Sequence, residues 1–196
     1  MTCDVQLFSQ VRSYLMSCND ENLQRGQRKP DAFILFQFPS QAKHKYDEVY
    51  PGVFLGDRTA AEDKRELKSL GITLVVNAAQ GSKFNQINTN AEFYTDVDMK
   101  FHPIPALDIM TYKINKYFKD AAEAIDKCLL SKGKVFVHCQ QGISRSAAIV
   151  LAFLMIKRDM DVMQAVKSVR AKREIFPNEG FLKQLCELDE ELHKAC

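Results

Sequence analysis

Residues 135–154 constrain the fold of this chain more than any other segment. The apolar run Val135-Phe136-Val137 is followed by a short loop, which leads into a second apolar run from Ala147 to Leu154. A short apolar run bounded by turn residues is typical of a buried strand, and a longer run is typical of a buried helix. The sequence therefore predicts a buried strand, a tight loop and the start of a helix, in that order.

The loop between these two runs carries residue types that suit phosphate chemistry. It reads His138-Cys139-Gln140-Gln141-Gly142-Ile143-Ser144-Arg145-Ser146. A loop that opens a helix directs several backbone amides, and the positive end of the helix dipole, at one point. Gly142 would let the backbone curl around an anion, and Arg145 could bind two phosphate oxygens at once. The same field would lower the pKa of the Cys139 thiol and make it a nucleophile, while Ser146 could donate to the thiolate. The competing interpretation is a strand-to-helix turn with a buried structural cysteine.

This string resembles the Cys-x5-Arg-Ser/Thr loop of the protein tyrosine phosphatases, with a histidine before it. The resemblance is greatest to the small, atypical dual-specificity phosphatases of the vaccinia-H1-related type, and it runs from about Tyr46 to Leu192. Outside the loop it rests on Gly71-Ile72-Thr73, Val76-Asn77-Ala78-Ala79 and Pro177-Asn178-Glu179-Gly180-Phe181-Leu182. It implies hydrolysis of phosphotyrosine and phosphoserine or phosphothreonine through a phospho-cysteine, without a cofactor. In that mechanism Cys139 is the nucleophile, and the phosphate is held by Gln140, Gln141, Gly142, Ile143, Ser144 and Arg145.

A second catalytic group must deliver a proton to the departing oxygen, and a loop carboxylic acid is the usual solution. Asp108 follows a predicted strand and precedes a predicted helix, so its loop should lie at the same sheet edge as Cys139. It stands 31 residues before Cys139, as the general acid does in the family that the chain resembles. Asp96 and Asp98 are alternatives, but they precede the strand and should lie at its other end. Asp108 could otherwise be a surface or helix-capping aspartate.

Two further residues receive roles from this comparison. His138 is expected to fix the loop and to help lower the pKa of the thiol, although it could be a merely packed histidine. Arg173 matches a family arginine that contacts a second phosphate, which would favour segments phosphorylated on both Thr and Tyr. It could equally be an ordinary surface arginine at the end of a helix.

Two rival functions remain open at this point. One is a phosphoprotein-binding module that grips phosphate without chemistry, although the joint presence of Cys139, Asp108 and Arg145 argues against it. The other is a phosphatase acting on RNA, lipid or glycan phosphate. The side chains of Gln140, Gln141 and Ile143 are neutral, which disfavours a polyanionic lipid head group.

Composition narrows the partners and the compartment. The 196 residues hold 27 basic and 25 acidic side chains, so no charge excess indicates nucleic acid as a partner. No run reaches the ~20 apolar residues of a membrane span, and the first residues lack the pattern of a signal peptide. The six cysteines therefore indicate reduced thiols, and we expect a protein of the cytoplasm or of the nucleus. Neither the cysteines nor the four histidines have metal-ligand spacing, so no metal site is predicted.

The order of predicted elements indicates the fold and its boundaries. Short buried strands at Val53–Leu55, Thr73–Val76, Phe101–Ile104 and Val135–Val137 alternate with helices at Thr59–Leu70, Ile114–Leu130, Ser144–Arg158, Val162–Lys172 and Glu179–His193. This alternation predicts an α/β fold in which a mainly parallel central sheet is flanked by helices. We expect residues 46–196 to form the catalytic domain.

Residues 1–45 are expected to form an N-terminal extension with an amphipathic helix from Asp4 to Met16 and an aromatic segment from Ala32 to Phe38. Arg28-Lys29 followed by Phe33-Ile34-Leu35 resembles a docking peptide for MAP kinases. An aromatic strap packed on the domain is the simpler interpretation. An exposed run of Phe33, Phe36 and Phe38 would instead favour a homodimer or another partner surface.

Overall fold

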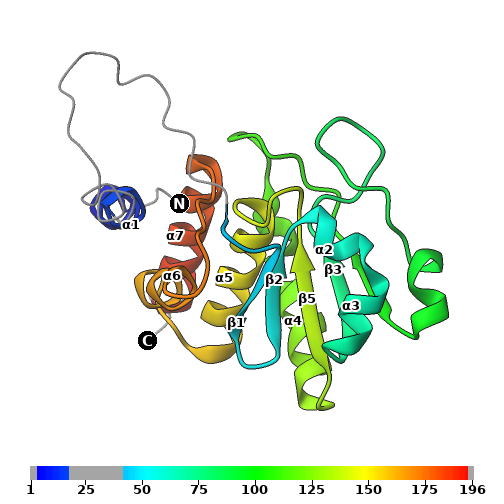
Figure 1. Cartoon of the computed structure of the whole chain (residues 1–196). Helices are drawn as coiled ribbons and strands as arrows, with labels where there is room; N and C mark the ends of the chain where they lie inside the picture. Colours follow the sequence, from blue (N-terminus) through cyan, green and yellow to red (C-terminus); the bar gives the residue numbers. More distant parts are fainter. Residues whose placement is uncertain (1–3, 18–41, 194–196) are drawn as a thin grey trace, which may run out of the picture.

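A five-stranded sheet forms the centre of the molecule (Figure 1). The structure is a computed structural model, and it describes residues 4–17 and 42–193. The strands lie in the order β1-β2-β5-β3-β4, and only β1 runs antiparallel to its neighbour. Their bounds are Tyr46–Tyr50 (β1), Val53–Gly56 (β2), Ile72–Asn77 (β3), Lys100–Pro103 (β4) and Lys134–His138 (β5).

Strand β5 occupies the middle of the sheet and brings the loop that follows it to a central position. Val137 pairs with Leu55 of β2 on one side and with Val76 of β3 on the other. The carboxyl ends of these parallel strands therefore meet at one edge, which is where open α/β sheets bind ligands. Cys139 follows β5 directly at this edge.

Helices cover both faces of the sheet (Figure 1). Alternate residues of β5 point to opposite faces, and the apolar side chains on each face need such a cover. Val135 and Val137 belong to the larger core, whereas Phe136 belongs to the smaller one. The larger core is closed by α1 (Val5–Ser17), α4 (Phe118–Leu130), α5 (Arg145–Arg158), α6 (Val162–Arg170) and α7 (Glu179–His193). The smaller core lies under α2 (Arg58–Glu62), α3 (Lys64–Ser69) and the 3-10 helix η1 (Glu92–Val97).

Helix α5 is buried on every side, which matches the continuous apolar run that predicted it. Its residues from Arg145 to Met155 are all buried. A helix that is apolar all round is buried, and α5 packs here against α4, α6, α7 and the sheet. The start of α5, which carries Arg145, is therefore held rigidly.

The predicted α/β fold with its mainly parallel sheet is confirmed, as are the four predicted strands and most of the helices. One helix prediction was wrong: Thr59–Leu70 is two helices, interrupted at Asp63, whose backbone leaves the helical region and whose side chain accepts from the Glu66 amide. The first of these helices is capped by Asp57 rather than Thr59. Helix Ile114–Leu130 also begins with a separate 3-10 turn, η2 (Ile114–Tyr117). Strand β1 was not predicted.

The predicted amphipathic helix near the N-terminus is present as α1, and it packs on the domain. Val11 and Leu15 are fully buried within the larger core, whereas Val5 is exposed. The aromatic segment and the resemblance to a docking peptide lie in residues 18–41, outside the described residues. Among the residues that the structure describes, no helix is both long and apolar enough to cross a membrane.

Candidate active site

The loop after β5 turns its carbonyl groups outward. The carbonyls of residues 140–143 accept hydrogen bonds from outside the loop, from the amides of Arg58 and Phe176 and from the guanidinium of Arg173. Within the described residues, none of the amides of residues 140–144 donates a hydrogen bond. With the carbonyls turned away, these amides are left to face an anion held inside the loop.

Gly142 is required by both the conformation and the packing of the loop. Its φ of +68° lies in the left-handed region that side chains with a Cβ rarely adopt. An added Cβ would stand 2.5 Å from the carbonyl oxygen of Gly56 and 2.7 Å from an Arg173 nitrogen. The loop therefore fits the end of β2 too closely for any other residue.

Replacing Gly142 by alanine is expected to destabilise the protein and weaken phosphate binding. The strained backbone and the steric overlap together should cost at least ~1–3 kcal/mol of unfolding free energy. Denaturant unfolding with and without inorganic phosphate measures both effects. The variant Gly71→Ala is the control. Its φ of +77° imposes the same strain, but an added Cβ would stand 3.9 Å from the nearest atom, Lys134 Cδ, and the site lies outside the loop. Equal losses of phosphate-dependent stabilisation in both variants would contradict a specific fit at Gly142.

Cys139 lies at the bottom of this loop, 1% exposed, with its sulfur 3.1 Å from the Ser146 hydroxyl, which donates to it. Burial alone would raise the pKa of the thiol. The positive charge of Arg145 and hydrogen bonds from the side chain and amide of Ser146 act in the opposite direction, and the net effect lowers the pKa of Cys139 below its ordinary value. The Ser146 contact that the sequence predicted is therefore present.

Arg145 is the largest fully buried side chain, and one edge of its guanidinium is fixed by two backbone carbonyls. Its Nη1 donates to the carbonyls of Asn85, at 2.7 Å, and Ala106, at 3.2 Å. Its Nε has no hydrogen-bond partner among the described residues, although Asp108 Oδ2 lies 3.4 Å away. A buried donor without an acceptor is costly, so this edge is prepared for an anion in the pocket.

Asp108 stands beside the loop, as predicted, and hydrogen bonds from two residues hold its side chain there. Its Oδ1 accepts from the Ser144 hydroxyl at 2.7 Å and from the Asn178 amide group at 2.9 Å. Its Oδ2 accepts no hydrogen bond, and about a fifth of the side chain is exposed. Asp108 therefore lies at the boundary between the loop and solvent, with Oδ2 in a 3.4 Å ion pair with Arg145 Nε.

These groups surround one cavity of about 490 Å³. Besides Cys139, Arg145 and Asp108, it is lined by Gln140, Gln141, Ile143, Ser144, Asn85, Met110, Phe176, Asn178 and Glu179. The described residues bring together no group of three or more histidine, cysteine or acidic side chains that could hold a metal ion. The cavity combines a buried nucleophile, an anion cradle and a carboxyl group in one space.

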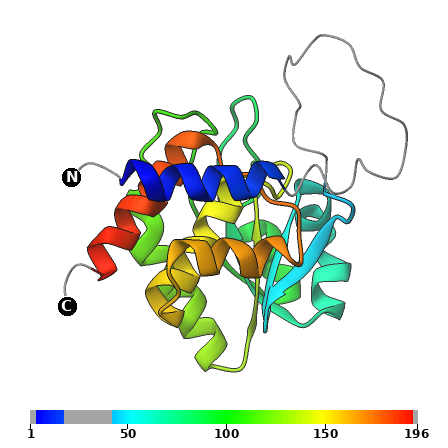
Figure 2. The same cartoon turned by 90° about the vertical axis from the view of Figure 1, so that its left-hand side faces the viewer.

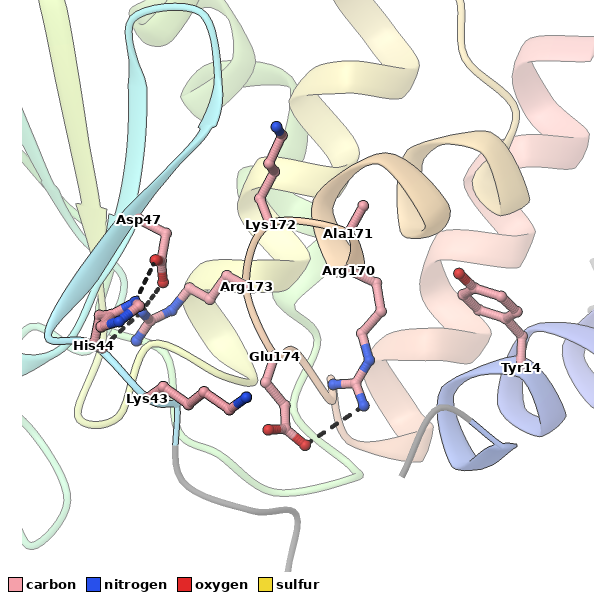
Figure 3. Close-up of a pocket in the computed structure, with 9 residues that line it drawn as sticks. All are labelled: Tyr14, Lys43, His44, Asp47, Arg170, Ala171, Lys172, Arg173 and Glu174. Carbon is pink, nitrogen blue, oxygen red and sulfur yellow. Dashed lines mark hydrogen bonds and ion pairs between the residues drawn. The ribbon is translucent and has the colours of Figure 1, made fainter. Parts of the chain in front are cut away.

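Arg173 supports the loop, and Figure 3 shows its guanidinium directed at Asp47 and His44. The contact with a second phosphate stays a prediction. Its side chain is fully buried, and its nitrogens donate to the carbonyls of Gln141, Gly142 and His44 and to the Asp47 carboxylate, the last at 2.8 Å. The sequence predicted either a surface residue or a phosphate contact. Both interpretations missed β1, which carries Asp47 and brings it under the loop.

His138 is a packed, neutral residue. Burial, together with the nearby positive charge of Arg145, lowers the pKa of its ring to about 3, so the ring carries no charge near neutral pH. Its ring stacks on Phe136 with 5.7 Å between the ring centres. The predicted support of the loop is consistent with this packing. The predicted help in lowering the pKa of the thiol stays a prediction, since the groups that lower the pKa of Cys139 here are Arg145 and Ser146.

Sequence reasoning missed Asn178 and Asn85. Asn178 precedes α7, and its side chain accepts from the Phe181 amide, so an N-cap signal was visible in the sequence. Its contact with Asp108, 70 residues away, left no local signal. Asn85 adopts a left-handed conformation at a φ of 62°, which asparagine tolerates and which turns its carbonyl toward Arg145.

Comparisons with known proteins agree with this geometry. A sequence model of the family described as "Dual specificity phosphatase, catalytic domain" matches residues 53–191. The human "Dual specificity protein phosphatase 13B" is 48% identical over 147 residues, which cover 74% of this chain and 73% of that protein. The crystal structure of human DUSP28 matches with a TM-score of 0.66 at 26% identity, over 76% of this chain and 95% of the other. The crystal structure of DUSP15 matches with a TM-score of 0.61 at 30% identity, over 76% of this chain and 90% of the other.

Proposed function

This chain belongs to the dual specificity phosphatase family and is a protein phosphatase, and we propose that Cys139, Arg145, Asp108 and Ser146 carry its reaction. The observation that supports these assignments best is the shared cavity. A buried thiol of lowered pKa lies there with a carboxyl group and with an arginine nitrogen that has no hydrogen-bond partner among the described residues. Dual specificity phosphatases work in two steps through a phospho-cysteine, and each step can be assigned to residues of this cavity.

In the first step, the Cys139 thiolate attacks phosphorus while the bond from phosphorus to the serine, threonine or tyrosine oxygen breaks. Asp108 gives a proton to the departing oxygen. Both hydrogen bonds to Asp108 end on Oδ1, so we assign the proton to Oδ2, which accepts no hydrogen bond and lies 3.4 Å from Arg145 Nε. The products are a phospho-cysteine, a neutral hydroxyl group on the dephosphorylated protein and the Asp108 carboxylate.

In the second step, water attacks the phospho-cysteine, and the Asp108 carboxylate accepts the proton that the water loses. The sulfur–phosphorus bond breaks and returns the thiolate. Ser146 stabilises this leaving group, because its hydroxyl already donates to the sulfur. The cycle ends with inorganic phosphate and the starting enzyme.

Throughout both steps, the phosphoryl oxygens are held by the loop amides of residues 140–144 and by the free edge of Arg145. These donors are fixed before substrate arrives, since the loop carbonyls and the other edge of Arg145 are already bonded elsewhere. Preorganised donors of this kind supply much of the stabilisation of a phosphoryl transition state.

Phosphoproteins are the substrates, and the neutral side chains of Gln140, Gln141 and Ile143 favour a single phosphoresidue over a polyphosphorylated head group. MAP kinases as substrates, and a homodimer as the assembly, are narrower proposals that rest on residues 28–38. Release of phosphate from peptides carrying phosphotyrosine, phosphothreonine or both, by the reduced full chain, tests the proposed function. An absence of release from every peptide, with Cys139 shown to be reduced, would overturn it.

The thiol of Cys139 should be alkylated by iodoacetate at pH values below those needed for an ordinary cysteine. Because Ser146 lowers the pKa of this thiol, the variant Ser146→Ala should shift the alkylation profile to higher pH. Mass spectrometry of the peptide that contains Cys139 gives the extent of alkylation at each pH, and Cys128 serves as the internal comparison. Inorganic phosphate should protect Cys139 alone. Identical pH profiles for Cys139 and Cys128 would contradict the assignment.

A further inference from the structure

The loop that carries Asp108 is in direct contact with the beginning of α7. A Cβ added at Gly180 would stand 1.8 Å from the carbonyl oxygen of Met110, two residues after Asp108. Asn178, immediately before α7, donates to Asp108 itself. No space separates the two segments here. A shift of the start of α7 must therefore move the loop that carries Asp108 or break the hydrogen bond from Asn178 to Asp108.

Helix α1 lies across α7 on the side away from the sheet (Figure 2). Arg12 Nε of α1 is 2.8 Å from Glu179 Oε1, the first residue of α7 and the neighbour of Asn178. The Lys183 ammonium lies 5.5 Å from the centre of the Phe8 ring, one turn farther along α7. Glu179 also lines the cavity that holds Cys139.

Burial fixes α1 in this place. Leu15 and Val11 are fully enclosed in the larger core, to which α7 contributes Phe181, Leu182 and Leu185. Burying two such apolar side chains stabilises the contact between α1 and the domain. The polar contacts on α7 then set where its first turn lies relative to α1.

Resting on the proposed role of Asp108 as general acid, we propose that α1 positions that acid through α7. Arg12 is a positioning residue in this scheme: it holds Glu179 at the start of α7, and the adjacent Asn178 holds Asp108. The nucleophile has supports of its own, because Ser146 of α5 donates to the Cys139 sulfur and Arg173 donates to the loop carbonyls. The segment before α7 also touches this loop, since the Asn178 amide donates to the Ser144 hydroxyl, so the test must separate an effect on the acid from an effect on the nucleophile.

The test uses leaving groups of different acidity. Hydrolysis of phenyl phosphate needs a proton from the general acid, whereas 2,4-dinitrophenyl phosphate releases an acidic phenol that leaves without one. The readout is the ratio of kcat/KM for the two substrates on one preparation, because kcat/KM reports formation of the phospho-cysteine, the step in which the leaving group departs. This ratio is independent of the fraction of folded enzyme. The variant Arg12→Gln should lower this phenyl-to-dinitrophenyl ratio about two- to five-fold, the range expected from loss of one exposed ion pair. Leu15→Ala should lower it at least as much.

Two controls separate positioning from general effects. Gln10→Glu changes the net charge by the same amount on an exposed site of α1 and should leave the ratio unchanged. In the Asp108→Asn background, Arg12→Gln should have no further effect on the ratio, because no acid remains to be positioned. The inference about α1 would be overturned, with the proposed function left standing, by either of two results. One is an unchanged ratio in Arg12→Gln, and the other is a decrease in the ratio on adding Arg12→Gln to Asp108→Asn that equals its decrease in the wild-type background. Failure of the wild type to hydrolyse either substrate would overturn the proposed function as well.

Discussion

Replacement of Cys139 by serine is expected to reduce turnover by at least ~10⁴-fold while leaving phosphate binding in place. A serine hydroxyl in the same position has no accessible anionic form near neutral pH, so the attack on phosphorus loses its nucleophile. The conformation of the loop and the position of Arg145 do not depend on the sulfur. The loop carbonyls accept from Arg58 and Arg173, and Arg145 donates to the carbonyls of Asn85 and Ala106. Phosphate release from a phosphotyrosine peptide measures the first effect, and equilibrium binding of the same peptide measures the second.

The matched control for this variant is Cys128→Ser. Cys128 is partly exposed on α4 and contacts the Thr73 hydroxyl at 3.2 Å, a contact that serine can keep. This variant should retain turnover within about two-fold, as expected for a substitution away from the cavity. Residual activity of Cys139→Ser within ten-fold of wild type would show that another residue attacks phosphorus.

Asp108→Asn is expected to lower turnover of phosphopeptides by on the order of 10²–10⁴-fold. An asparagine side chain can keep the contacts with Ser144 and Asn178 but has no proton of suitable acidity to give. The loss should be greatest for phosphothreonine, whose alkoxide is the poorest leaving group, and small for an aryl phosphate with an acidic phenol. Single-turnover kinetics on a series of aryl phosphates gives the dependence on leaving-group acidity.

Asp98→Asn is the control for this substitution. Asp98 precedes β4 and lies beside Lys100, Lys127 and Lys132 at a cavity on the other end of the sheet, as its sequence position predicted. Its φ of 57° is a conformation that asparagine adopts readily, so the fold should not change. A loss of turnover in Asp98→Asn that matches the loss in Asp108→Asn would remove the case for Asp108 as the acid.

The sequence was most informative where structure and chemistry are local. The strand, loop and helix of residues 135–154 lie together in the chain, so their apolar runs predicted both β5–α5 and the position of Cys139. Asp108 was also predictable, because a residue that follows a parallel strand must lie at the same edge of the sheet.

The supporting contacts were not predictable, because they join residues far apart in the chain. Asn178 reaches Asp108 across 70 residues, and Arg173 reaches Asp47 across 126. The charge state of His138 depends on complete burial, which follows from packing of the whole domain. The interruption at Asp63 was not predicted, because the apolar spacing continues across it. The break appears only in the backbone conformation and the helix caps.

A phospho-cysteine at Cys139 is the central claim, and rapid quenching tests it directly. The variant Ser146→Ala should form the intermediate but release the thiolate slowly, so phosphorylated enzyme should accumulate during turnover of an activated aryl phosphate. Mass spectrometry of the acid-quenched protein should then find one phosphoryl group, on the peptide that contains Cys139. Continued turnover with the phosphoryl group on another residue, or with no phosphorylated protein at any time point in this variant, would contradict the account.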